Sequence, residues 1–135
     1  MPSAASEWWV ERFRSDCAAL IGVDEIESAR FGIAVSGGPD SMALLWLAAQ
    51  ALPGHVWAAT VDHQLRSDAR AEAEMVEHWC ETQTISHAIL TPNKAITGSI
   101  QSAARAVRYA LLEDWRVTHN LDWIMTAHHA DDQLE

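Results

Sequence analysis

The residues best suited to chemistry form a glycine-rich turn at positions 36–41, with the sequence SGGPDS. A short apolar run at 31–35 precedes the turn, and an apolar helical pattern follows it. Glycines let the backbone approach a ligand closely, and a helix N-terminus directs N–H groups and partial positive charge at the same point. The arrangement therefore predicts a phosphate site, in which the hydroxyl of Ser41 either caps the helix or donates to a phosphate.

The turn differs from two common nucleotide-binding motifs. The P-loop of kinases and GTPases has four residues between its glycines and a lysine before Ser or Thr, and no lysine stands here. The dinucleotide fingerprint G-x-G-x-x-G does not occur either. A strand-to-helix turn without a ligand is the alternative, and the combination of paired glycines with a strand and a helix argues against it.

A second group of ionisable side chains follows the apolar run at 122–127. His128, His129, Asp131 and Asp132 stand where a helical pattern begins. Three interpretations stay open: a nucleotide site in which a histidine meets phosphate and an aspartate holds Mg²⁺, a transition-metal site, or the polar start of a helix. Adjacent histidines in a strand point to opposite faces, which disfavours a shared transition metal.

Helical and strand-like patterns alternate along the chain, which predicts an α/β fold. We expect a Rossmann-like parallel sheet with right-handed crossovers and helices on both faces. Ser6 and Ser67 are candidate N-caps, and Glu72, Glu74, Glu77 and Glu81 should form a solvated face. The expected helices are 6–20, 41–52, 67–83 and 99–119, and the expected strands are 31–35, 55–61, 87–90 and 122–127.

Composition limits the class of protein. The 135 residues are 49% hydrophobic, enough for one domain with a real core, and no run is long or apolar enough to span a bilayer. Two cysteines without C-x-x-C spacing fit a reduced, cytoplasmic protein and argue against a cysteine-based zinc or iron–sulfur site. A net charge of −10 disfavours unaided binding to nucleic acid, because phosphate contacts need Lys and Arg.

Four segments together carry a family resemblance: SGGPDS at 36–41, VDHQLR at 61–66, ARAVRYALL at 104–112 and TAHHADDQLE at 126–135. In this order they resemble tRNA(Ile)-lysidine synthase, of the ATP pyrophosphatase (PP-loop, SGGxDS) family. The resemblance implies an adenine nucleotide alpha hydrolase-like fold. It also implies that 1–29 is an N-terminal helix and connector, and that 30–135 is the N-terminal portion of a truncated PP-loop domain without its C-terminal tRNA-binding parts.

The resemblance also implies an activity. Such ligases use ATP to adenylate carbon 2 of the wobble cytidine of an isoleucine tRNA, and the lysine amine then displaces AMP to form lysidine. ATP and Mg²⁺ would be required, tRNA(Ile) and L-lysine would be substrates, and a homodimer stays open. The alternatives are another PP-loop enzyme such as a tRNA thiolation enzyme, a non-catalytic ATP-binding module, or a fragment that is inactive by itself.

Site residues follow from the matching segments. The resemblance assigns nucleotide binding to Ser36, Gly37, Gly38, Pro39, Asp40, Ser41, Val61, Asp62 and His63. It assigns catalysis to Asp40, Arg105, Arg108, His128 and Asp131, and Mg²⁺ to Asp40 and Asp132. Because Arg105 and Arg108 share a helical face, we expect one of them to contact phosphate or the substrate base. A surface salt bridge is the alternative for Arg105, and Tyr109 should serve packing.

Overall fold

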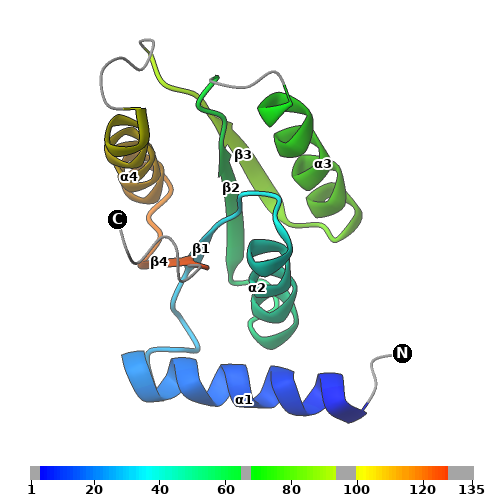
Figure 1. The fold of residues 1–135 in the computed structure, drawn as a ribbon. Helices are drawn as coiled ribbons and strands as arrows, with labels where there is room; N and C mark the ends of the chain where they lie inside the picture. Colours follow the sequence, from blue (N-terminus) through cyan, green and yellow to red (C-terminus); the bar gives the residue numbers. More distant parts are fainter. Residues whose placement is uncertain (1–3, 65–67, 94–99, 128–135) are drawn as a thin grey trace.

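The computed structural model describes residues 4–64, 68–93 and 100–127. Within these residues, helices and strands alternate as the sequence predicts (Figure 1). The elements are α1 (Ala4–Ile21), β1 (Phe31–Ala34), α2 (Pro39–Ala51), β2 (Val56–Val61), α3 (Ala69–Thr82), β3 (Ser86–Leu90), α4 (Ile100–Thr118) and β4 (Trp123–Thr126).

The four strands form one parallel sheet in the order β3-β2-β1-β4. Phe31 of β1 lies opposite Val56 of β2 on one side and Trp123 of β4 on the other. The chain therefore moves outward from β1 to β3 and then returns past β1 to form β4. This reversal makes the carboxyl end of β1 a topological switch point, where open α/β sheets bind their ligands. The prediction of a Rossmann-like parallel sheet is confirmed.

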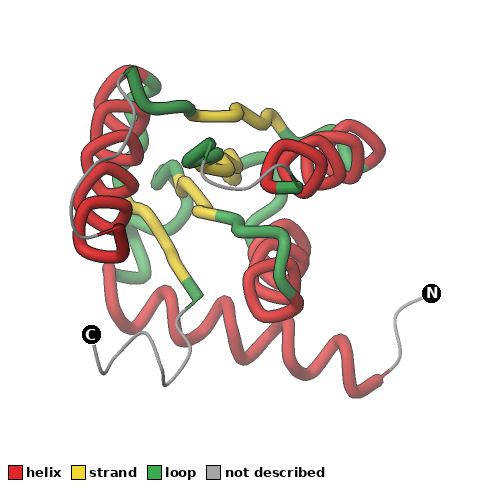
Figure 2. Tube along the Cα trace, turned by 45° about the horizontal axis from the view of Figure 1, so that its top comes forward, coloured by secondary structure: helices red, strands yellow, loops and turns green. Residues whose placement is uncertain are grey.

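Helices cover both faces of the sheet, as predicted (Figure 2). On one face, alternate residues such as Ile33 and Ala58 belong to a core cluster that includes buried residues of α1, α2 and α3. On the other face, Ala59 packs with Leu112 and Trp115 of α4. Right-handed crossovers explain this division, because reversing the direction of travel across the sheet moves the connecting helix to the opposite face.

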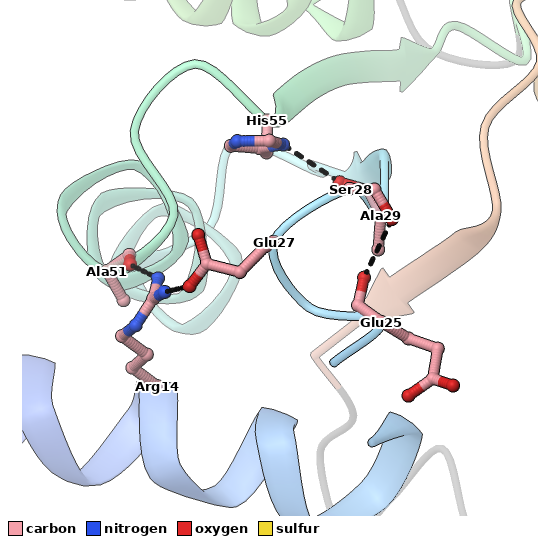
Figure 3. A network of polar contacts seen from close by, with 7 residues as sticks. All are labelled: Arg14, Glu25, Glu27, Ser28, Ala29, Ala51 and His55. Carbon is pink, nitrogen blue, oxygen red and sulfur yellow. Dashed lines mark hydrogen bonds and ion pairs between the residues drawn. The ribbon is translucent and has the colours of Figure 1, made fainter. Parts of the chain in front are cut away.

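α1 packs against α2 near the amino ends of the strands, whereas the SGGPDS turn lies at the carboxyl end of β1 (Figure 1). Arg14 of α1 holds this helix against its neighbours through two contacts (Figure 3). Its Nη1 donates to the carbonyl oxygen of Ala51 at 2.9 Å, and its Nη2 lies 2.7 Å from Oε1 of Glu27. The guanidinium thus satisfies a carbonyl at the C-terminal end of α2, where the last turn has no basic residue of its own. In the same view, Nδ1 of His55 lies 3.0 Å from the carbonyl oxygen of Ala29. The predicted boundary between an N-terminal helix and connector (1–29) and the PP-loop portion (30–135) stays a prediction.

Three predicted helix starts are wrong by a few residues. α1 begins at Ala4, so Ser6 lies inside its first turn and is not the N-cap. α2 begins at Pro39 with Gly38 as its N-cap, because proline has no N–H to leave unsatisfied at the first helical position. α3 has its N-cap at Asp68, one position later than predicted. No helix among the described residues has both the length and the apolar character needed to cross a membrane.

Candidate functional site

The turn after β1 is held in one conformation by glycine geometry and by a serine. Gly37 has a φ of +92°, which residues with a Cβ rarely adopt, and Gly38 follows in an extended conformation. Ser41 is buried, and its Oγ accepts from the N–H of Ser36 at 3.0 Å and donates to the carbonyl of Gly38 at 3.2 Å. Ser41 is therefore not the N-cap of α2. From within the first turn of this helix, its hydroxyl hydrogen-bonds to Ser36 and to Gly38 and so links the two ends of the glycine turn.

A cavity of about 290 Å³ opens beside this turn at the carboxyl ends of β1, β2 and β4. Its volume lies near the lower end of the range of small-molecule sites, about 300–1,000 Å³. Five segments contribute lining residues: Ser36 and Ser41 from the turn, Thr60, Val61 and His63 from the end of β2, Ala69 and Glu72 from α3, Arg108 and Leu112 from α4, and Thr126 and Ala127 at the end of β4.

Arg108 and Glu72 bring opposite charges to the cavity from helices on opposite faces of the sheet. Glu72 lies against the turn, since a Cβ placed on Gly37 would be 3.6 Å from the Cβ of Glu72. The prediction of a solvated face is therefore wrong for this half-buried carboxylate, although Glu74 and Glu81 are exposed. Glu72 lies in the first helical turn after the end of a strand, and this position is the sequence signal that could have identified it as a site residue.

His63 presents an imidazole to the same cavity. Its Nδ1 is buried and has no hydrogen-bond partner among the described residues. Burial lowers the pKa of His63 below its ordinary value, and the nearby cation of Arg108 lowers it further, against the opposing effect of Asp62. A neutral imidazole with an unpaired nitrogen can hydrogen-bond a ligand in the cavity.

Asp62, predicted to bind nucleotide, is buried and lies outside the cavity lining. Its Oδ1 accepts from the N–H of Gln64 at 2.9 Å, and its own N–H donates to the carbonyl of Leu90 at 2.8 Å. These contacts hold the chain where Gln64 adopts a φ of 63°. Asp62 therefore shapes the turn that presents His63, while its neighbour Val61 lines the cavity.

The structure separates the two predicted arginines. Both guanidinium carbons lie 5.2 Å from the ring centroid of Tyr109, but Arg108 lines the cavity and Arg105 does not. Tyr109, predicted to serve packing, is 40% exposed, and its ring contacts the two guanidinium groups instead of the core.

Asp40 is exposed in the first turn of α2, next to the cavity-lining Ser41, and Gly37, Gly38 and Pro39 complete the turn. His128, Asp131 and Asp132 lie outside the described residues. Among the residues that are described, no group of three or more His, Cys, Asp or Glu side chains could hold a metal ion. Asp40 is thus the one predicted Mg²⁺ ligand whose position the structure gives.

A second histidine, His87 of β3, has the same electrostatic character as His63. Burial lowers its pKa below 6.5, with a smaller opposing effect from Glu77. Both imidazoles are therefore neutral in the native state at pH values where the unfolded chain takes up protons. Below about pH 6.5 the unfolded chain binds more protons at these two histidines than the native state does. The free energy of unfolding therefore keeps its full value above about pH 6.5 and falls as the pH is lowered.

We expect the free energy of unfolding in urea to fall less steeply from about pH 7 to pH 5 in the double variant His63→Gln, His87→Gln than in the original chain. Titrating carboxylates change the free energy of unfolding equally in both proteins. The difference between the two curves therefore gives the contribution of the two histidines alone. Parallel curves would contradict the prediction.

Comparison with known proteins places this chain in a family. The PP-loop domain family matches residues 11–135. The chain is 44% identical over 124 residues to tRNA(Ile)-lysidine synthase of Novosphingobium aromaticivorans, covering 92% of this chain and 36% of that protein. It is 48% identical over 110 residues to the synthase of Zymomonas mobilis, covering 80% and 33%. The chain thus spans about a third of the length of these curated relatives.

Solved structures show the same fold at low sequence identity. U34-tRNA thiolase NcsA from Methanococcus maripaludis matches with a TM-score of 0.74 at 16% identity, covering 94% of this chain and 47% of that one. NH3-dependent NAD synthetase from Campylobacter jejuni matches with a TM-score of 0.66 at 17% identity, covering 91% and 57%. With the SGGPDS turn at the switch point of the sheet and a family match over most of its length, the chain belongs to the PP-loop domain family.

Proposed function

We propose that this chain is the ATP-binding part of an enzyme that forms lysidine in tRNA(Ile), with L-lysine as the second substrate. One observation carries the proposal: the SGGPDS turn, Arg108 and His63 meet at a single cavity at the carboxyl edge of the sheet. The similarity to tRNA(Ile)-lysidine synthases, at 44% and 48% identity, supports the choice of reaction within the PP-loop family.

The residues of the cavity suit the first half of this reaction. The carbonyl oxygen at carbon 2 of the cytidine attacks the α-phosphorus of ATP, the bond to the β-phosphate breaks, and pyrophosphate leaves. Negative charge then grows on the phosphate oxygens, so fixed donors that already point at them lower the barrier. The N–H groups at the start of α2 and the guanidinium of Arg108 would supply these donors, and Ser41 keeps the turn in place.

The second half replaces AMP with lysine. The ε-amino nitrogen of lysine bonds to carbon 2, the bond from carbon 2 to oxygen breaks, and AMP leaves with that oxygen. Mg²⁺, when bound, would neutralise charge on the phosphates. We assign it to Asp40 and Asp132, because carboxylates are the ligands it prefers.

A tRNA thiolation enzyme is the second candidate, because a tRNA thiolase shares the fold. Cys17 and Cys80 are both buried, and neither lines the cavity. Burial raises the pKa of both thiols, that of Cys80 to about 11, so neither is a ready thiolate at neutral pH. This observation favours lysine transfer over sulfur transfer. Two buried thiols also fit a reducing cytoplasm, where we place the reaction.

Calorimetric titration with ATP and Mg²⁺ tests the nucleotide site. We expect saturable binding to the 135-residue chain, weaker binding of GTP, and loss of ATP binding in the double variant Asp40→Ala, Ser41→Ala. The variant removes the brace between Ser36 and Gly38 and the carboxylate in the first turn of α2. Circular dichroism must show that the variant is folded. Equal affinity of the folded variant for ATP would overturn the proposed site.

A transfer assay then separates lysidine formation from its alternatives. In the full-length protein, radiolabelled lysine should become attached to tRNA(Ile) only with ATP. If ATP binds but no lysine is transferred, the proposal of a lysidine-forming enzyme is wrong and a non-catalytic ATP-binding module is favoured. Analytical ultracentrifugation of the same sample tests whether the protein forms a homodimer.

A further inference from the structure

The lining of the cavity contains a buried hydroxyl that the motifs did not identify. Thr60, the fifth residue of β2, is 2% exposed and lines the cavity. Its Oγ1 lies 2.9 Å from Nε2 of His87, which comes from the neighbouring strand β3. Since β3 is an edge strand and Thr60 lies on the next strand inward, the imidazole reaches the hydroxyl from the outer side of the sheet.

The environment of His87 decides which way this hydrogen bond runs. Nδ1 is buried and has no hydrogen-bond partner among the described residues. A buried acceptor without a partner is tolerated more often than a buried N–H without one. The unpartnered Nδ1 therefore favours the neutral tautomer with its proton on Nε2, in which this N–H donates to Oγ1 of Thr60. The lowered pKa of His87 is consistent with a neutral ring at pH 7.

The direction of the bond determines what Thr60 can do. A threonine hydroxyl has one proton to donate and two lone pairs to accept with. When His87 donates to one lone pair, the hydroxyl proton remains for an acceptor other than His87. The residue lines the cavity beside the turn, because β1 and β2 pair in parallel and the N–H of Val35 donates to the carbonyl of Ala59.

We propose that Thr60 is a nucleotide-contacting donor, and that His87 is a positioning residue that orients the Thr60 hydroxyl toward an acceptor atom of the bound nucleotide. This inference rests on the proposed nucleotide site and adds a binding residue to it. The acceptor is an oxygen or nitrogen of the nucleoside or an oxygen of the phosphates, and comparison of ligands distinguishes the two.

Binding measurements on matched variants test the contact. Thr60→Val keeps the shape of the side chain but removes the hydroxyl, and should weaken ATP binding by about tenfold. Thr60→Ser keeps the hydroxyl and should bind within about threefold of the original chain. If adenosine loses affinity in parallel with ATP, the acceptor belongs to the nucleoside; if only ATP does, it belongs to the phosphates. Equal affinity of Thr60→Val for both ligands would overturn the proposal.

The positioning role of His87 requires a separate readout. His87→Leu should weaken ATP binding by about threefold, and His87→Gln, whose amide N–H can replace Nε2–H, should restore most of it. Because His87 acts through Thr60, adding His87→Leu to Thr60→Val should cause no further loss. Independent effects that multiply in the double variant would show that His87 does not act through Thr60.

Nuclear magnetic resonance tests the tautomer without any ligand. The side-chain nitrogen shifts of His87 at pH 7 should show the proton on Nε2, and a proton on Nδ1 would overturn the inferred direction of the bond. This measurement also separates two failures. If the original chain does not bind ATP, the proposed nucleotide site fails. If the chain binds ATP and Thr60→Val binds equally well, the site stands and only this inference fails.

Discussion

Replacement of Arg108 by alanine in the full-length protein is expected to lower lysine transfer to tRNA(Ile) by about a hundredfold or more. Arg108 lines the cavity from α4, whereas Glu72 lines it from α3. Arg108 would meet phosphate oxygens whose negative charge grows as pyrophosphate leaves, so its loss should reduce the rate more than ATP affinity. The measurement is the rate of radiolabelled lysine incorporation at saturating ATP.

Three further substitutions make this result specific. Arg108→Lys keeps the charge without the planar fork and should give an intermediate rate. Arg105→Ala should cost less than Arg108→Ala, because Arg105 does not line the cavity. Arg12→Ala should leave transfer unchanged, since Arg12 lies on α1 and pairs with Asp16 at the surface, 3.2 Å away. A larger loss in Arg105→Ala than in Arg108→Ala would contradict the assignment.

The same variant has a readout that does not depend on catalysis. The cation of Arg108 helps to lower the pKa of His63. Removing that cation should therefore raise the pKa of His63, which proton shifts of the imidazole in a pH titration would report. An unchanged pKa would show that Arg108 does not act on the cavity as inferred.

Gly32→Ala is expected to destabilise the fold by about 2–3 kcal/mol and to lower the thermal midpoint by roughly 8 °C. Gly32 lies in β1 under α4, and a Cβ at this position would stand 2.6 Å from Cζ3 of Trp115 and 2.9 Å from Cδ1 of Leu121. Both side chains are buried, so neither can move aside without opening the core. Thermal unfolding followed by circular dichroism measures the loss.

Gly38→Ala is the matched control for stability. Gly38 has a φ of −74°, which alanine adopts freely, and its Cβ would meet only Oγ of Ser36 at 3.5 Å. Its thermal midpoint should stay within about 2 °C of the original, because less chain entropy is lost on folding and no contact is strained. Similar losses in both variants would show that the close approach of α4 to β1 does not determine the effect.

The sequence by itself predicts the architecture because that architecture depends on local and repetitive properties. Apolar runs with strand character alternate with helical patterns, and right-handed crossovers then leave few ways to arrange four parallel strands. The SGGPDS turn could be located at a strand end because a positive φ at Gly37 requires glycine and Pro39 suits a first helical position. Helix starts were less predictable, since several polar residues near each start can serve as the cap.

The tertiary structure decided which side chains share the cavity. Helical periodicity places Arg105 and Arg108 on one face, but only the packing of α4 on the sheet selects Arg108. The approach of Glu72 to the turn brings together residues far apart in the sequence, as does the hydrogen bond between His87 and Thr60. Such contacts depend on strand order and on the depth at which each helix packs. These are set by the fit of buried side chains from the whole domain, which no single segment encodes.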